Sequence, residues 1–121
     1  MLIWAVSEPR QLSLNARKLI QNPEIPLYVS AASGWEIATK YRLGKLPQSA
    51  RLVSDYRGTL GRLGARSLAI NEEHALAAGS LVSDHRDPFD RILAAQAVVE
   101  GLDLVTNDKR LARLPGVKAR W

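Results

Sequence analysis

Residues 85–108 read HRDPFDRILAAQAVVEGLDLVTND and decide the fold class. Asp87 is a favourable N-cap residue, and Pro88 suits the first position of a helix because its fixed backbone angle matches that conformation. Side chains suited to a buried face then recur at helical spacing as far as Gly101, at Phe89, Ile92, Leu93, Gln96 and Val99. Residues 102–106, LDLVT, follow at once and are predicted to form a strand. The stretch therefore predicts one helix followed directly by one strand.

The rest of the chain repeats this alternation. Apolar spacing predicts further helices over residues 12–20, 33–42, 48–63, 71–79 and 109–114, and short β-prone runs predict strands over residues 27–31, 67–70 and 117–121. Strands separated by helices are typical of an α/β fold with a mainly parallel sheet. A length of 121 residues, without linkers or repeats, predicts a single domain over residues 1–121.

The composition excludes several classes of protein. With 46% hydrophobic and 24% charged residues, the chain has the composition of a globular protein rather than a disordered one. The absence of cysteine excludes a disulfide framework, a thiolate zinc site and a cysteine nucleophile, and it fits a reducing cytoplasm. No apolar run approaches the roughly 18 residues that a membrane span needs. We therefore expect a cytoplasmic protein with no membrane association.

The charge balance favours acidic partners, nucleic acid first. Seventeen lysines and arginines against twelve acids give a net charge of +5. The basic residues are scattered except for a cluster near the C-terminus, made up of Lys109, Arg110, Arg113, Lys118 and Arg120. On charge alone, a surface that only keeps the protein in solution is an equally good interpretation.

Most catalytic motifs are absent. Gly58, Gly61 and Gly64 match neither the dinucleotide fingerprint nor the P-loop, and the sequence contains no Gly-x-Ser-x-Gly and no His-Glu-x-x-His. His74 and His85 have no second histidine at ligand spacing, so both are interpreted as surface or core residues.

Three acids lie just past a predicted strand or at the start of a predicted helix: Glu36, Asp90 and Asp108. Ligands of open parallel sheets bind beyond the carboxyl ends of the strands, and gathered carboxylates favour Mg²⁺ or Mn²⁺. Such a site can activate water against a phosphodiester. Capping is the alternative for each acid: residues 33–36 (SGWE) fit a capping box, and Asp87, Asp90 and Asp108 fit the first turns of their helices.

At these same residues the chain resembles the PIN-domain family, and within it the VapC-type toxins of bacterial toxin–antitoxin pairs. The resemblance spans essentially the whole chain and is strongest at residues 30–40 (SAASGWEIATK), 42–46 (RLGKL), 85–97 (HRDPFDRILAAQA) and 104–108 (LVTND). It implies a three-layer α/β sandwich around a mainly parallel central sheet. It also implies a Mg²⁺- or Mn²⁺-dependent endoribonuclease.

The resemblance assigns roles to individual residues. Glu36, Asp90 and Asp108 correspond to the second, third and fourth metal-binding catalytic acids of the family. Asp87 is a nearby supporting candidate, and Thr106 is a candidate for orienting a ligand. Arg86 and Arg91 are candidates for RNA phosphate contacts, with surface or structural roles as the alternative. The partners implied are an RNA substrate, a cognate antitoxin that inserts a segment near the active-site groove, and a second copy in a homodimer.

One departure from the family pattern concerns the first acid. In the family this acid ends an opening apolar strand, usually within Asp-Thr-His, and is followed by a pattern such as Val-Leu-Ile-Trp-Ala. Residues 1–5 read MLIWA and resemble the segment after that acid, so we expect the first strand and its acid to be missing. Our hypothesis is that a GTG valine codon inside the gene has been read as the start. An immediate upstream stop codon, or no upstream strand ending in Asp-Thr-His, would contradict it.

The missing acid leaves two rival functions open. The first is a non-catalytic, truncated PIN domain that binds RNA or antitoxin without cleavage. The second is a different α/β phosphate-handling enzyme, such as a small phosphatase, for which the sequence shows no nucleophile motif.

Overall fold

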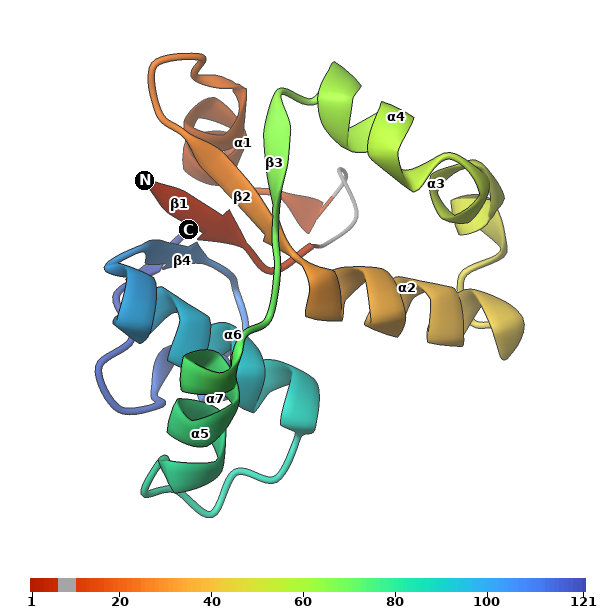
Figure 1. Ribbon diagram of the computed structural model, residues 1–121. Helices are drawn as coiled ribbons and strands as arrows, with labels where there is room; N and C mark the ends of the chain where they lie inside the picture. Colours follow the sequence, from red (N-terminus) through yellow and green to blue (C-terminus); the bar gives the residue numbers. More distant parts are fainter. Residues whose placement is uncertain (7–10) are drawn as a thin grey trace.

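The fold is built on a five-stranded, all-parallel sheet with the strand order β3-β2-β1-β4-β5 (Figure 1). The structure is a computed structural model, and it describes residues 1–6 and 11–121. The strands are β1 (Leu2–Trp4), β2 (Leu27–Ser30), β3 (Ala65–Leu68), β4 (Asp103–Val105) and β5 (Ala119–Arg120). The helices are α1 (Leu14–Gln21), α2 (Ala31–Arg42), α3 (Ala50–Ser54), α4 (Tyr56–Arg62), α5 (Glu72–Ser80), α6 (Pro88–Glu100) and α7 (Lys109–Ala112), with a short 3-10 turn, η2, at Pro47–Ser49. The predicted α/β class is confirmed.

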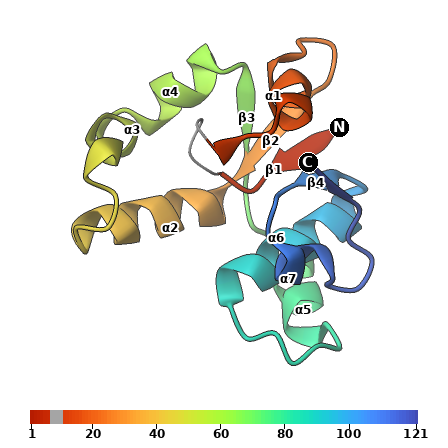
Figure 2. The same cartoon turned by 180° about the vertical axis from the view of Figure 1, so that it is seen from behind.

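Helices cover both faces of the sheet and form a core on each (Figures 1 and 2). Side chains alternate along each strand, so Leu2 and Trp4 enter one core while Ile3 enters the other. The first core contains residues of α1 and α4, and the second contains residues of α6 and α7. This three-layer arrangement explains why the middle strands are apolar on both faces.

The centre of the sheet differs from the sequence-based expectation. We expected the central strand to be missing, but Leu2–Trp4 occupies that place as β1 and pairs in parallel with both β2 and β4. All three side chains are buried, which suits a Leu-Ile-Trp segment in a strand covered on both sides. The expectation of an empty centre is therefore corrected. Residues 1–6 nevertheless contain no acid.

The predicted helix over residues 48–63 is broken into η2, α3 and α4. The break comes at Asp55, whose backbone leaves the helical conformation and whose carboxylate accepts a hydrogen bond from the Gly58 amide to cap α4. A side chain on Gly58 would collide with that carboxylate. The glycine in the predicted helix therefore serves a cap rather than a continuous helix.

The start of α2 removes one alternative for Glu36. The helix begins at Ala31, and the Ser30 hydroxyl accepts a hydrogen bond from the Ala32 amide as its N-cap. Ser33 lies buried inside the helix, so the expected capping box over residues 33–36 is wrong. Glu36 lies in the second turn and cannot satisfy the amides at the helix start.

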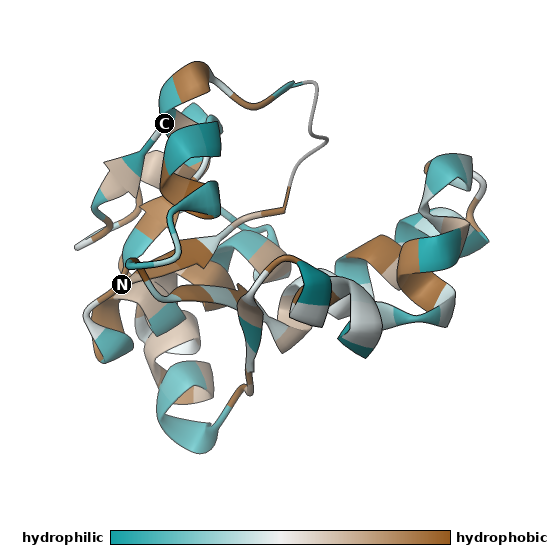
Figure 3. Cartoon of the chain, turned by 90° about the horizontal axis from the view of Figure 1, so that it is seen from above, coloured by the Kyte–Doolittle hydropathy of each residue, from teal (hydrophilic) through white to brown (hydrophobic). Residues whose placement is uncertain are grey.

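Helices α2, α3 and α4 form an arm that extends from the sheet (Figure 3). Apolar and polar residues alternate along this arm.

Among the described helices, none is both long and apolar enough to cross a bilayer.

Candidate active site

The candidate acids lie where the strand order reverses. The chain moves outward from β1 through β2 to β3, then returns to β4 on the other side of β1. The crevice beyond the carboxyl ends of β1 and β4 is therefore the topological switch point, where open α/β sheets bind their ligands. Glu36 lies on the helix that follows β2, Asp108 follows β4, and Asp90 lies in the first turn of α6.

Glu36 is half-buried and next to other charges. Burial raises the pKa of the Glu36 carboxyl above its ordinary value. The Lys40 ammonium opposes this rise from one helical turn away, with its Nζ 3.7 Å from Oε2 of Glu36. The negative charges of Asp87 and Asp90 add to the rise in pKa. The carboxylate therefore lies within electrostatic range of Asp87, the N-cap of α6, and of Asp90 in the first turn of that helix.

Asp90 links the acids to one another. Burial raises its pKa, and the charges of Asp87 and Asp108 raise it further. His85 opposes that rise, because its Nε2 donates a hydrogen bond of 2.8 Å to Oδ2 of Asp90. Since the charge of Asp90 interacts with those of both Glu36 and Asp108, the three acids form one electrostatic group.

Asp87 and Asp108 are both N-caps, as the alternative interpretation predicted. The Asp87 carboxylate accepts from the amides of Phe89 and Asp90. Oδ1 of Asp108 accepts from two amides of α7, those of Arg110 and Leu111. Capping uses one oxygen of each carboxylate. It therefore leaves the second oxygen of Asp108 available for another ligand.

Thr106 supports Asp108 through the backbone. Its hydroxyl accepts a hydrogen bond of 3.1 Å from the Asp108 amide, and the residue is buried. The threonine thus fixes the turn that presents Asp108, rather than touching the carboxylate.

The acids fit a hard divalent cation by their chemistry and charge. Mutual repulsion and burial penalise their ionised forms, and a bound cation would relieve both costs. Within residues 1–6 and 11–121, no three acidic or histidine side chains converge into a ready-made metal cage. Mg²⁺ commonly uses one or two carboxylates and completes its shell with water and substrate phosphates, so an incomplete cage remains suitable.

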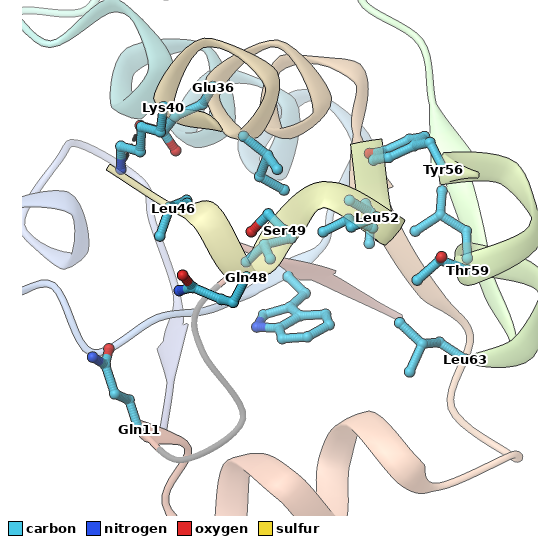
Figure 4. Close-up of a pocket in the computed structure, with 15 residues that line it drawn as sticks. Gln11, Glu36, Lys40, Leu46, Gln48, Ser49, Leu52, Tyr56, Thr59 and Leu63 are labelled. Atoms are coloured by element: carbon cyan, nitrogen blue, oxygen red, sulfur yellow. Dashed lines mark ion pairs between the residues drawn. The ribbon is translucent and has the colours of Figure 1, made fainter. Parts of the chain in front are cut away.

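A largely apolar groove of about 570 Å³ begins at Glu36 (Figure 4). Glu36 and Lys40 lie at one end, and Tyr56, Thr59 and Leu63 lie at the other. Its lining comes from β1, β2, the arm of α2 to α4, and residues Val6 and Gln11. Two buried polar atoms on this lining, Nε1 of Trp4 and the Tyr56 hydroxyl, have no hydrogen-bond partner among the described residues.

The family follows from a sequence comparison. The family model for the PIN domain matches residues 1–117. The chain belongs to the PIN-domain family. Ribonuclease VapC16 of Mycobacterium tuberculosis is 38% identical to this PIN domain over 58 residues, which is 48% of this chain and 41% of that relative. Ribonuclease VapC22 of the same organism is 30% identical over 109 residues, or 89% of this chain and 82% of that relative.

Solved structures support the PIN fold. A chain of the VapBC2 complex from Rickettsia felis, bound to a DNA fragment from their promoter, superposes with a TM-score of 0.62. The two chains are 19% identical, and the match covers 86% of this chain and 79% of the other. At this identity the match shows that the two chains share a fold.

Two residues of this PIN-domain site were missed by sequence reasoning. Lys40 could have been found, because its spacing of four residues from Glu36 places both on one face of α2. His85 was interpreted only as a surface or core residue, and the structure instead places it against Asp90. Its position depends on a loop conformation that no helical or strand period encodes.

The two arginines that are candidates for RNA contacts, Arg86 and Arg91, differ in their surroundings. Arg91 donates to four backbone carbonyls between residues 78 and 85, which is a structural role. Arg86 is exposed beside the site.

His74 is a core residue, only 1% exposed, and its Nε2 contacts Glu100 at 2.8 Å. In the basic cluster, Lys109, Arg110, Arg113 and Lys118 are exposed, while Arg120 pairs with Asp103 at 3.0 Å.

Proposed function

We propose that this PIN domain is a toxin of a toxin–antitoxin pair that hydrolyses RNA phosphodiesters with a divalent metal ion, Mg²⁺ or Mn²⁺. Glu36, Asp90 and Asp108 are its metal-binding catalytic residues. The observation that carries the proposal is the electrostatic group of these three acids at the topological switch point of the sheet. The named VapC ribonucleases that match this chain support the same reaction class.

Each acid has a separate part in this proposal. Asp90, at the centre of the group, offers Oδ1, and Asp108 offers the oxygen that its cap leaves over. Glu36 would bind the metal ion from α2. Its carboxylate would either give up the ion pair with Lys40 or keep it with one oxygen. The bound cation supplies charge for the phosphodiester oxygens and lowers the pKa of a coordinated water.

RNA and an antitoxin are the partners that we propose, with a homodimer as the assembled state in the cytoplasm. The net charge of +5 favours the RNA backbone. Large apolar side chains exposed on α5 and in the loop after it, Leu76 and Val82, offer surface for self-association. Measuring the solution mass by light scattering tests the dimer.

The apolar groove is the surface that we propose for the antitoxin segment. Glu36 is part of its lining, so a peptide lying in it would also obstruct RNA phosphates bound at Glu36. Leu52→Asp in the lining should weaken antitoxin binding by at least about 10-fold while leaving RNA cleavage unchanged. Leu14→Asp, an equal change at an exposed residue of α1, is the matched control.

The decisive experiment is cleavage of RNA by the purified protein. Cleavage should need Mg²⁺ or Mn²⁺, stop in EDTA, and disappear in Glu36→Gln and in Asp90→Asn. Both substitutions keep the side-chain shape and remove the charge, so loss of cleavage in a variant whose unfolding temperature is not lowered would assign the effect to the site.

The alternative is a PIN domain that binds RNA or antitoxin without cleaving. Two observations favour it: residues 1–6 place no acid at the centre of the sheet, and the described acids form no complete cage. RNA binding retained with no cleavage in either metal would establish this alternative and overturn the nuclease proposal.

A further inference from the structure

We propose that His85 is a positioning residue, which orients the Asp90 carboxylate toward the bound metal ion, and that Arg91 holds His85 in place. This inference rests on the proposed function, because it assumes that Asp90 is a metal ligand. It adds two residues to the site that touch neither the ion nor the RNA.

The first step is the contact between His85 and Asp90. Nε2 of His85 lies 2.8 Å from Oδ2 of Asp90, and the two side chains are only 11% and 14% exposed. A hydrogen bond to one oxygen restricts the rotation of the carboxylate. Oδ1 has no protein partner among the described residues and is left for a metal ion. A metal ligand held in this way loses less conformational freedom when the ion binds.

The second step concerns the loop that carries His85. Residues 81–87 belong to no helix or strand, so the backbone alone does not fix the imidazole. The guanidinium of Arg91 holds the loop by hydrogen bonds to its backbone. It donates to the carbonyl oxygens of Ala78 at 3.0 Å, Leu81 at 2.7 Å, Ser83 at 3.2 Å and His85 at 2.8 Å. The Ser83 hydroxyl also accepts from the His85 amide at 3.1 Å.

The arrangement uses helix α6 as a rigid base. Asp90 and Arg91 are neighbours in its first turn, so one side chain presents the candidate ligand while the next one holds the loop. Asp90 needs no histidine to stabilise the helix, since an acid in the first turn is already favoured by the helix dipole. The hydrogen bond to His85 is therefore not needed for helix stability, and we assign to it the orientation of the Asp90 carboxylate.

The experiment measures Mn²⁺ binding to the metal-free protein by calorimetry. His85→Ala should weaken Mn²⁺ binding by about 10-fold to 100-fold. His85→Gln, whose amide can donate from a similar position, should recover part of this loss. Glu100→Ala is the matched control, because it removes the other contact of 2.8 Å between a histidine and a carboxylate, and it should leave Mn²⁺ binding unchanged.

Arg91→Gln tests the second step and should also weaken Mn²⁺ binding. Its matched control is Arg66→Gln, the same change at an exposed residue of β3. Thermal unfolding without metal checks that each variant is folded. In RNA cleavage, His85→Ala should lower kcat at limiting Mn²⁺ and leave KM for RNA unchanged, and a higher Mn²⁺ concentration should restore kcat.

The outcomes separate this inference from the proposed function. If the wild-type protein bound no Mn²⁺, the proposed function would fail and the inference with it. If the wild-type protein bound Mn²⁺ and folded His85→Ala bound it equally well, only the inference would be overturned. A loss of binding in His85→Ala that His85→Gln partly reverses supports the positioning role.

Discussion

The Trp35 indole meets the Phe89 ring edge to face, with the ring centroids 5.1 Å apart and the planes at 81°. This contact joins α2 to α6, and each aromatic residue directly precedes a candidate metal ligand, Glu36 or Asp90. Trp35 is 68% exposed, so the contact lies at the surface and not in either core. The pair therefore joins the two helices next to two of the candidate acids.

Trp35→Ala should therefore impair the site more than the stability. Edge-to-face pairs contribute about 0.5–1.5 kcal/mol beyond buried area, so we expect a loss of about 1 kcal/mol in the free energy of unfolding. RNA cleavage should fall further than this loss explains, and Trp35→Phe should restore most of it. Denaturant unfolding and initial cleavage rates measure both effects. Leu14→Ala, at another exposed apolar residue, should change neither.

Asp108 allows capping and metal binding to be separated. Asp108→Ala removes the N-cap of α7 and should cost about 1 kcal/mol of stability, whereas Asp108→Asn keeps a good cap. Both variants should lose RNA cleavage by at least about 100-fold, since both remove the charge. Thermal unfolding in EDTA and cleavage in Mg²⁺ test this prediction. Full cleavage by folded Asp108→Asn would show that the residue is only a cap.

The raised pKa values of Glu36 and Asp90 predict a pH dependence of stability without metal. A carboxyl with a raised pKa binds more protons in the folded state than in the unfolded state, so its contribution to stability falls as pH rises. The fall begins above about pH 4, where the unfolded carboxyls ionise, and ends above the pKa of the folded state. Thermal unfolding in EDTA from pH 4 to pH 7.5 should show a smaller decline for the double variant Glu36→Gln, Asp90→Asn. An identical decline for both proteins would contradict the prediction.

The basic cluster next to Asp108 should contact RNA. Lys109 and Arg110 follow Asp108 directly and are exposed, so their charges lie beside the candidate site. Removing both charges by Lys109→Ala with Arg110→Ala should weaken RNA binding. The slope of the logarithm of the binding constant against the logarithm of the salt concentration should become shallower by about 0.7 for each lost phosphate contact. Fluorescence anisotropy at several salt concentrations, without divalent metal, measures this.

The matched control for that experiment is the double variant Lys18→Ala with Arg57→Ala. It removes the same charge from exposed residues of α1 and α4. Equal losses in the two double variants would mean that only the net charge matters, and that the cluster is the solubilising surface which the sequence allows equally well.

The sequence predicted the elements that rest on short-range chemistry. The Asp87 cap, Pro88 and Gly101 define α6 correctly, and Gly101 ends it with a left-handed φ of 67°. It did not predict the break at Asp55 or the start of α2 at Ala31, because both depend on which of several polar side chains reaches a backbone amide. The central strand was also not expected, because Leu2–Trp4 resembles a different part of the family pattern.

For the site, the sequence by itself predicted the α/β class, and it placed Asp90 in the first turn of a helix and Asp108 just after a strand, since periodicity and capping are local properties. Only the tertiary structure decided that Asp90 lies within electrostatic range of both Glu36 and Asp108, that Glu36 is no cap, and that His85 contacts Asp90. The reason is physical. Burial and charge–charge interactions depend on which segments, distant in the sequence, the parallel sheet brings to one edge.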